Sequence, residues 1–255
     1  PYTTLFRSYI SDRSADIKLK DDAQITMNLM NLHLVFALDR AGFVGNDGHT
    51  HHGLYDMVMF CTMPNTTVFA PRDYISLKRS LDYAIEKVDG PCAVRYPRGC
   101  EFLNTYDASK EVRAVTADDY SDILLPYKAK ETGRDYCIIS VGNSFKDADD
   151  AADILEERGI SGLHISLTLV KPLPIDEIIK MTSGIRYIFT VEEGMAVGGV
   201  GDLIDSKLPD HYICENIGVE DPVVRAASQK RQKEIAAIDA FSIAERIINT
   251  LKAEG

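Results

Sequence analysis

The sequence predicts an α/β protein built from two doubly wound sheets. Short apolar runs, of the length of buried strands, alternate along the chain with segments whose apolar residues recur at helical spacing. Strand, helix and strand in succession imply parallel strands joined by right-handed crossovers. With 255 residues, the chain is long enough for two domains, given roughly 100–200 residues per domain. In such sheets, ligands bind where the strands end.

Composition disfavours several classes of function. The chain is 45% hydrophobic and 26% charged, as in ordinary soluble proteins, and its formal net charge of -11 argues against a general nucleic-acid partner, because phosphate contacts need a basic surface. No apolar run is long enough to cross a membrane, and no signal-peptide pattern is present. The five cysteines lack CxxC spacing and are interpreted as reduced core residues. We therefore expect a cytoplasmic protein that binds neither nucleic acid nor membrane.

The first half of the chain alternates strands and helices after an unusual beginning. Residues 1–8, PYTTLFRS, resemble the translation of a sequencing adapter, so we expect residues 1–20 to lie outside the fold and the chain to be a fragment. Apolar spacing then predicts helices at 21–31, 54–61 and 73–88, the last capped by Asp73, and strands at 34–39, 66–70 and 92–96.

The second half repeats this alternation after a polar, acidic connector at 101–134. Strands are predicted at 136–141, 162–170, 187–191 and 212–217, and helices at 148–158, 175–181 and 235–251, with one more helix starting in the glycine-rich segment after Glu192 and Glu193. We place the two domains at 21–115 and 116–255, because the loosely patterned connector marks a boundary.

The loop after the predicted strand at 34–39 carries three of the chain's six histidines. Among four glycines it carries Arg40, Asp47, His49, His51 and His52. Glycine admits backbone conformations that other residues avoid, and it lets a ligand approach closely. Arg98 follows the strand at 92–96, so both arginines are expected at the carboxyl edge of one sheet. We infer that this edge binds a ligand.

Simpler interpretations exist for these residues. Arg40 and Arg98 could be surface salt-bridge partners, since most charged side chains are solvated. Asp47 stands in Asn-Asp-Gly, where aspartate is by default a turn residue. Glu192 and Glu193 are interpreted as a strand end and a turn at a domain or subunit contact, and the glycines after them as structural.

A metal site is a further alternative. The pair His49-x-His51 after a strand is typical of amidohydrolase-type metal sites, with His164 and His211 as distant candidate ligands. We disfavour this alternative because the predicted strands do not build the eight-stranded barrel of those enzymes.

Five blocks of sequence carry a resemblance to a known family. They are DRAGFVGNDGHTHHG at 39–53, PNTTVFAPRD at 64–73, GPCAVRYPRG at 90–99, VKPL at 170–173 and TVEEGMAVGGVGD at 190–202. In order and spacing they resemble the 1-deoxy-D-xylulose-5-phosphate synthases, thiamine-diphosphate enzymes of the transketolase-like superfamily. The resemblance implies a truncated pyrimidine-binding domain at 21–115 and a transketolase C-terminal domain at 116–255.

The resemblance also implies a reaction and roles for the loop residues. Enzymes of the family condense decarboxylated pyruvate with glyceraldehyde 3-phosphate to give 1-deoxy-D-xylulose 5-phosphate for isoprenoid and thiamine biosynthesis. Arg40 and Arg98 match the positions that grip the acceptor phosphate, Asp47 matches a substrate contact, and His51 matches a catalytic residue that hydrogen-bonds substrate or assists proton transfer. His49 and His52 match no expected residue and are interpreted as tuning polarity.

Other parts of the family's active site are not expected in this sequence. In the family, a separate N-terminal domain holds the diphosphate through Mg²⁺, and an upstream glutamate activates the cofactor; residues 12–18 do not match the helix that carries a further phosphate-binding arginine. We therefore expect the fragment alone to be inactive, and the complete enzyme to be a homodimer. Two alternatives remain: a split transketolase or pyruvate dehydrogenase beta-type subunit, and a non-catalytic binding module of the same fold.

Overall fold

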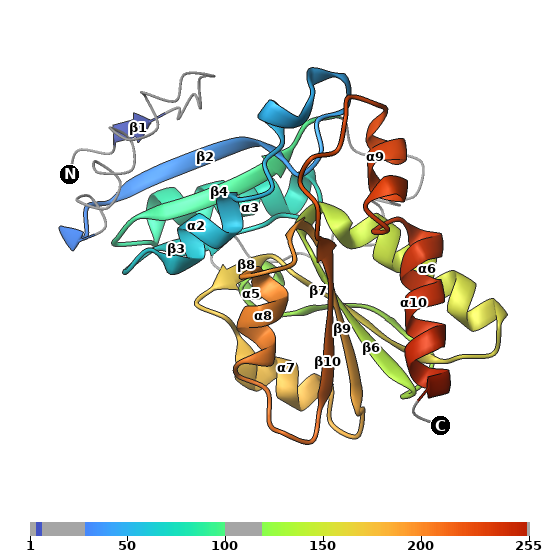
Figure 1. The fold of residues 1–255 in the computed structure, drawn as a ribbon. Helices are drawn as coiled ribbons and strands as arrows, with labels where there is room; N and C mark the ends of the chain where they lie inside the picture. The colour runs from blue at the N-terminus through green and yellow to red at the C-terminus, as the bar shows by residue number, and fades with distance from the viewer. Residues whose placement is uncertain (1–3, 7–28, 100–118, 254–255) are drawn as a thin grey trace.

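The computed structural model describes residues 4–6, 29–99 and 119–253, which form two mixed sheets of five strands each (Figure 1). The first sheet has the strand order β1-β2-β4-β3-β8 and the second the order β10-β9-β6-β7-β5. Each sheet is parallel except for one antiparallel edge strand. The predicted α/β class with two wound sheets is confirmed.

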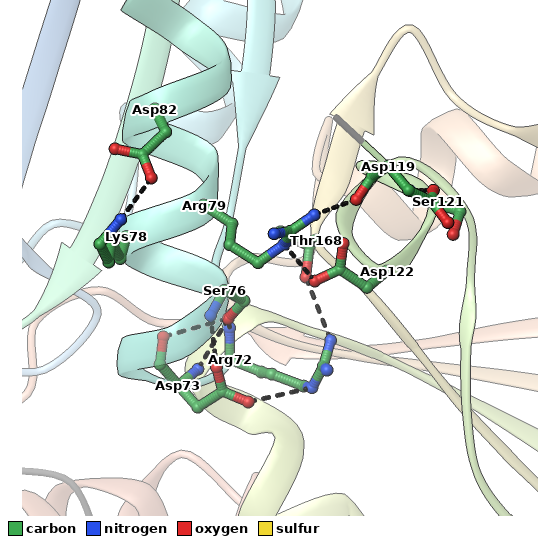
Figure 2. Close-up of polar contacts among 10 residues, drawn as sticks. All are labelled: Arg72, Asp73, Ser76, Lys78, Arg79, Asp82, Asp119, Ser121, Asp122 and Thr168. Carbon is green, nitrogen blue, oxygen red and sulfur yellow. Dashed lines mark hydrogen bonds and ion pairs between the residues drawn. The ribbon is translucent and has the colours of Figure 1, made fainter. Parts of the chain in front are cut away.

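The first sheet consists of β1 (Thr4–Phe6), β2 (Leu34–Ala41), β3 (Thr67–Phe69), β4 (Cys92–Pro97) and β8 (Leu169–Lys171). Its central strand β4 begins with three fully buried residues, Cys92, Ala93 and Val94, as expected for a parallel strand covered on both faces. The accompanying helices are α2 (Asp56–Thr62) and α3 (Tyr74–Glu86). Asp73 caps α3 as predicted, because its carboxylate accepts the Ser76 N–H at 2.7 Å (Figure 2).

The second sheet consists of β5 (Tyr127–Glu131), β6 (Tyr136–Val141), β7 (Gly162–Leu167), β9 (Tyr187–Met195) and β10 (Ile213–Val219). Two helices, α6 (Phe145–Glu157) and α10 (Ala240–Ala253), cover one face, and α7 (Ile175–Met181) and α8 (Val200–Asp205) cover the other (Figure 1). Short helices are α5 (Ser121–Leu124), α9 (Gln229–Ile235), η1 (Gly45–Asp47), η2 (His49–His51) and η3 (Gly142–Ser144).

One predicted strand is divided in the structure, and one predicted helix begins later than expected. The strand predicted at 162–170 ends at Leu167, and the chain then crosses to the first sheet, where β8 pairs antiparallel with β3. Thr168 makes the crossing, because its carbonyl accepts the Ala70 N–H at 2.7 Å. The helix predicted at 235–251 begins only at Ala240, as α10, because Ile235 ends the preceding helix α9 and Ala237, between the two helices, adopts a left-handed conformation with φ of 55°.

Other predictions fall partly outside the described residues. The helix expected at 21–31 lies mostly there, as does the connector at 101–134, whose described part contains α5 and β5. Of residues 1–20, which we expected to lie outside the fold, Thr4–Phe6 forms β1 and pairs parallel with β2. The rest of that segment lies outside the described residues.

The two sheets share one hydrophobic core. Phe36 and Val68 of the first sheet belong to the same buried cluster as Ile139 and Ile165 of the second. Arg72 links the sheets at the edge of this core: its guanidinium lies 4.0 Å from the centre of the Tyr127 ring. It also donates to the Thr168 hydroxyl at 3.4 Å (Figure 2). The loops at the carboxyl end of the first sheet therefore rest on a second domain that is packed tightly against them.

Candidate functional site

The loop from Gly42 to Gly53 leaves β2 through a sharply turned base. Arg40 has φ of 61° and Gly42 has φ of 77°, so the chain reverses in two left-handed steps. The Gly42 N–H donates to the Gly53 carbonyl at 2.8 Å, and the Gly53 N–H donates back to the Gly42 carbonyl at 2.9 Å. A side chain at position 42 would meet the Glu193 carboxyl, with the added Cβ only 2.5 Å away. The loop is thus closed at its base and pressed against the second domain.

A pocket of about 450 Å³ opens where β2 and β4 end. It is lined by Asp39, Arg40, Asp47, Tyr96, Pro97 and Arg98. Arg40 stands at the end of β2, Arg98 directly follows β4, and Asp47 is the last residue of η1. The structure therefore brings three of the four predicted site residues to one pocket, at the sheet edge that the strand order predicts.

Asp47 bridges the two arginines. One carboxylate oxygen, Oδ1, lies 2.5 Å from Nη1 of Arg98, and the other, Oδ2, lies 3.7 Å from Nε of Arg40. The hydrogen bond from Arg98, with smaller contributions from the charge of Arg40 and from His51, lowers the pKa of Asp47 below its ordinary value of 3.8. Asp47 is therefore ionised at neutral pH.

The arginines keep donors for an anionic ligand. Both guanidinium side chains are nearly half exposed, at 43% for Arg40 and 48% for Arg98. Nη1 of Arg40 donates to the Asp39 carboxylate at 3.3 Å. Nε of Arg40 is buried and has no hydrogen-bond partner, although buried polar atoms in proteins are normally hydrogen-bonded. An oxyanion bound in the pocket would offer this donor an acceptor.

The fourth predicted residue, His51, does not line the pocket. It ends η2, is half buried, and its Nδ1 lies 3.1 Å from the Thr50 hydroxyl. Its imidazole is close enough to Asp47 to help lower the pKa of that carboxyl. His51 thus lies near Asp47 without lining the pocket.

His52 has a structural role that the sequence did not predict. Its Nδ1 accepts the Val44 N–H at 3.3 Å, its Nε2 lies 3.3 Å from the Val224 carbonyl, and its ring meets Phe43 edge-on at 5.0 Å. Burial lowers the pKa of His52, which favours the neutral imidazole that these two contacts require, with a proton on Nε2 only. His52 therefore ties the loop to the second domain.

Glu193 makes a second tie between the loop and the second domain. It is 2% exposed, and its Oε1 accepts the Phe43 N–H at 2.7 Å. Its Oε2 accepts from the Asn143 amide and lies 3.1 Å from the Lys233 ammonium. Burial works against the charge of Lys233, but Glu193 and Asp147 outweigh it and raise the pKa of Lys233. Glu193 lies at a contact between the domains.

Two family profiles match the chain in succession. "Transketolase, pyrimidine binding domain" matches residues 1–100, and "Transketolase, C-terminal domain" matches residues 127–243. The chain belongs to the transketolase-like family. Its fold agrees: a "Split gene transketolase, inactive beta4 tetramer" aligns with a TM-score of 0.74 at 22% identity, over 93% of this chain and 74% of that one. A transketolase mutant from Pichia stipitis aligns with a TM-score of 0.72 at 19% identity, over 93% of this chain and 33% of that one.

Within this family, the chain is similar to several curated proteins that share one name. A protein from Syntrophus aciditrophicus named "1-deoxy-D-xylulose-5-phosphate synthase" is 34% identical over 97% of this chain and 36% of its own length. Proteins of the same name from Thermomicrobium roseum and Acaryochloris marina are 34% and 33% identical over 89% and 88% of this chain. The chain spans about a third of the length of these relatives, 34–36%.

Arg95, a third arginine near the loop, lies on β4 and has a structural role. Arg95 is 2% exposed and its Nε donates to the Asp56 carboxylate at 2.9 Å. Its Nη2 donates to the carbonyls of Gly53 and Glu193, at 3.0 and 3.2 Å. Arg95 therefore joins the end of the loop, the start of α2 and the second domain, and it does not line the pocket.

Glu192 points away from the loop into the second domain. It is 1% exposed, and its Oε1 accepts the Gly201 N–H at 2.9 Å while its Oε2 has no partner. Burial raises the pKa of Glu192 to about 7, although the N–H groups of Gly201 and Val200 and the charge of Arg95 oppose this. Glu192 is thus a buried group that titrates near neutrality within the packing of α8.

The histidines of the metal alternative do not form a metal cluster. His164, on β7, is buried between the Ser140 hydroxyl, 2.9 Å from its Nε2, and the Asp149 carboxylate, 3.1 Å from its Nδ1. Ser140 is fully buried, so this arrangement offers no accessible nucleophile. Across residues 29–99 and 119–253, no group of three or more His, Cys, Asp or Glu side chains is placed to hold a metal ion. In the same residues, no helix is long and apolar enough to cross a membrane.

Proposed function

We propose that this chain supplies the acceptor half of the active site in a thiamine-diphosphate-dependent synthase. The reaction joins decarboxylated pyruvate to glyceraldehyde 3-phosphate and gives 1-deoxy-D-xylulose 5-phosphate for isoprenoid and thiamine biosynthesis. One observation carries the proposal: Arg40, Asp47 and Arg98 meet at one pocket at the ends of β2 and β4, and Nε of Arg40 has an ion pair with Asp47 at 3.7 Å but no hydrogen-bond partner. The similarity to synthases of that name supports it.

The acceptor phosphate would lie between the two arginines. Guanidinium groups bind phosphate through parallel N–H donors, and both arginines line the pocket and are nearly half exposed. Asp47 is paired with both arginines, so a phosphate that enters the pocket would weaken the ion pairs of Asp47 with Arg40 and Arg98. The ionised Asp47 would then accept a hydrogen bond from a hydroxyl of the acceptor.

His51 would act at the reactive end of the acceptor. An aldehyde carbonyl becomes a hydroxyl when a carbon nucleophile adds to it, so its oxygen needs a proton. His51, near Asp47 and half buried, carries an imidazole that can hold and transfer a proton. It would donate a hydrogen bond to the carbonyl oxygen and pass the proton to it. His51 is therefore the proposed catalytic residue of this half-site.

The proposal places the diphosphate end of the cofactor outside this chain. In the family, thiamine diphosphate is bound through Mg²⁺, and across residues 29–99 and 119–253 no group of three or more His, Cys, Asp or Glu side chains is placed to hold a metal ion. We assign no step through the cofactor. In the proposal, thiamine diphosphate and Mg²⁺ are bound by another segment or chain, and this chain alone is inactive.

Phosphate-ester binding tests the half-site directly. Titration calorimetry of the chain with glycerol 3-phosphate, an unreactive analogue of the acceptor, would compare wild type with Arg98→Ala. Charge-assisted hydrogen bonds contribute about 1.5–3 kcal/mol each. Because the Arg98 side chain is 48% exposed, we expect the lower limit, about a tenfold loss of affinity.

Arg158→Ala is the matched control. Arg158 is another exposed arginine, 41% exposed, that pairs with Glu245 away from the pocket. Equal affinities of the two variants would refute the phosphate site. The complete gene product, supplied with thiamine diphosphate and Mg²⁺, is expected to release carbon dioxide from pyruvate when glyceraldehyde 3-phosphate is added.

A separate-subunit arrangement is the second candidate. The chain covers 74% of the split-gene transketolase but only 34–36% of the named synthases. An upstream open reading frame continuous with residue 9 supports a single-chain enzyme, whereas a start codon near residue 21 supports a subunit. Either arrangement predicts association of copies, as in the neighbour described as a tetramer, and sedimentation analysis measures it; for the single-chain enzyme we expect a homodimer. A non-catalytic module predicts no phosphate-ester binding.

A further inference from the structure

The segment Phe43-Val44-Gly45 connects the closed base of the loop to η1, which ends in Asp47. All six backbone polar groups of this segment have partners. Within the loop's own domain, the Val44 N–H reaches His52 at 3.3 Å and the Val44 carbonyl accepts from Arg98 at 3.0 Å. The other four groups are paired with side chains of the second domain. Side chains from outside the loop therefore hold this stretch in place.

Gln232, on α9, forms hydrogen bonds with both backbone polar groups of Gly45. Its Oε1 accepts the Gly45 N–H at 2.9 Å, and its Nε2 donates to the Gly45 carbonyl at 3.1 Å and to the Arg225 carbonyl at 3.2 Å. The residue is fully buried. A carboxamide suits the position because it carries an acceptor and two donors without a charge. Gly45 has φ of 71°, so these hydrogen bonds stabilise a left-handed backbone conformation.

Gln229, one turn earlier on α9, connects the loop to an arginine of the pocket. Its Nε2 donates to the Phe43 carbonyl at 2.7 Å and to the Arg98 carbonyl at 3.1 Å. Arg98 in turn donates from Nη1 to the Val44 carbonyl. The backbone of Arg98 and the loop that carries Asp47 are thus joined through one amide group.

These contacts link both sides of the pocket to one helix. The pairing of β2 with β4 ends at Ala41 and Pro97, and beyond that pair side-chain contacts join Arg98 to the loop that carries Asp47. Figure 1 shows α9 of the second domain beside this loop. A shift of α9 would move the Gly45 turn and the Arg98 backbone relative to each other.

We propose that Gln229 and Gln232 are positioning residues for the acceptor phosphate. They hold the backbone of Arg98 and the loop that carries Asp47 in fixed positions, and Asp47 bridges the two arginines, so the second domain sets the phosphate affinity of a pocket formed by the first. This inference rests on the proposed function, since it concerns the same pocket. It predicts that the two glutamines affect binding of the phosphate group and leave recognition of the rest of the acceptor unchanged.

Two methionine variants test the proposal. Gln232→Met and Gln229→Met keep the length of the side chain and remove its donors and acceptor. Titration with glycerol 3-phosphate is expected to show about a tenfold loss of affinity for each. Lys230→Met, an exposed position on the same helix, should bind as wild type does. In the complete enzyme, the KM for glyceraldehyde 3-phosphate should rise, while kcat/KM for unphosphorylated glyceraldehyde stays within twofold.

A stability control separates positioning from general weakening. Ile243→Val removes one methylene from the buried face of α10, away from the pocket, and gives a variant of lowered melting temperature. If Ile243→Val loses phosphate affinity as the glutamine variants do, the effect is general destabilisation and the proposal is wrong. Should Gln232→Met fail to fold, Gln229→Met carries the test, because Gln229 is only half buried.

The outcomes distinguish this inference from the proposed function. If Arg98→Ala weakens binding and both glutamine variants bind as wild type does, the positioning role is refuted and the phosphate site stands. If the wild-type chain binds no glycerol 3-phosphate, or Arg98→Ala binds as Arg158→Ala does, the phosphate site itself is refuted, and the inference with it.

Discussion

Replacing Glu192 by glutamine should stabilise the protein at alkaline pH and not at acidic pH. Glu192 is 1% exposed, and burial raises its pKa from the ordinary 4.5 to about 7. Between these two values the folded state holds a proton that the unfolded state has released. The wild-type protein therefore loses stability as the pH rises from about 4.5 through 7. Glutamine cannot ionise, and its Oε1 can still accept the Gly201 N–H.

The size of the effect follows from the shift. One pKa unit corresponds to about 1.4 kcal/mol, so the advantage of Glu192→Gln over wild type should grow by roughly 2–3 kcal/mol between about pH 5 and 8. For a protein of this size, roughly 2–4 °C of melting temperature corresponds to each kcal/mol. We expect a gain of about 4–12 °C in relative melting temperature over that range.

Thermal unfolding followed by circular dichroism at several pH values measures this difference. Glu220→Gln is the matched control, because the Glu220 side chain is 76% exposed and its ion pair with Arg246 is long, at 3.7 Å between Oε1 and Nη1. Its stability difference from wild type should change little with pH. A Glu192→Gln difference that stays constant from acidic to alkaline pH would refute the assignment of a buried group titrating near neutrality.

Three further predictions concern single residues. Arg95→Met should lower the free energy of unfolding, measured in urea, by about 3–5 kcal/mol, because Asp56 is left buried without its partner. The double variant Arg95→Met, Asp56→Leu should recover most of this free energy, and a double variant as unstable as the single one would contradict the reasoning. Asp47→Asn should raise the affinity for inorganic phosphate in calorimetry, since the carboxylate bridging both arginines loses its charge; weaker binding would show that Asp47 is needed to hold them. Ser140→Ala should cost about 1 kcal/mol in urea unfolding, the value of one hydrogen bond to His164; a loss of phosphate binding would be unexpected.

The sequence alone predicts the local elements well where the physical signal is local. The strand at 136–141 and the helix at 175–181 match the structure residue for residue, and Asp73 caps its helix, because apolar spacing and a capping side chain depend on neighbours a few residues away. Arg40 and Arg98 were predicted at one sheet edge for a similar reason. Parallel strands place their carboxyl ends together whatever the rest of the chain does.

Tertiary structure decided how those elements are divided and what holds the pocket. The apolar run at 162–170 suits one strand, but pairing with β3 of the other sheet divides it. Nothing near Gln232 in the sequence indicates that it pairs with Gly45, 187 residues away. The pKa of Glu192 likewise depends on burial under α8 and on distant Arg95.

The physical reason is the same in each case. Amphipathic spacing and turn chemistry are properties of neighbouring residues, so they can be recognised along the chain. Hydrogen-bond partners, burial and charge separation belong to residues that meet only after folding. By itself the sequence indicated Arg40, Asp47 and Arg98 as pocket residues, whereas the packing of the second domain on the loop decided how these three are held and left His51 outside the pocket lining.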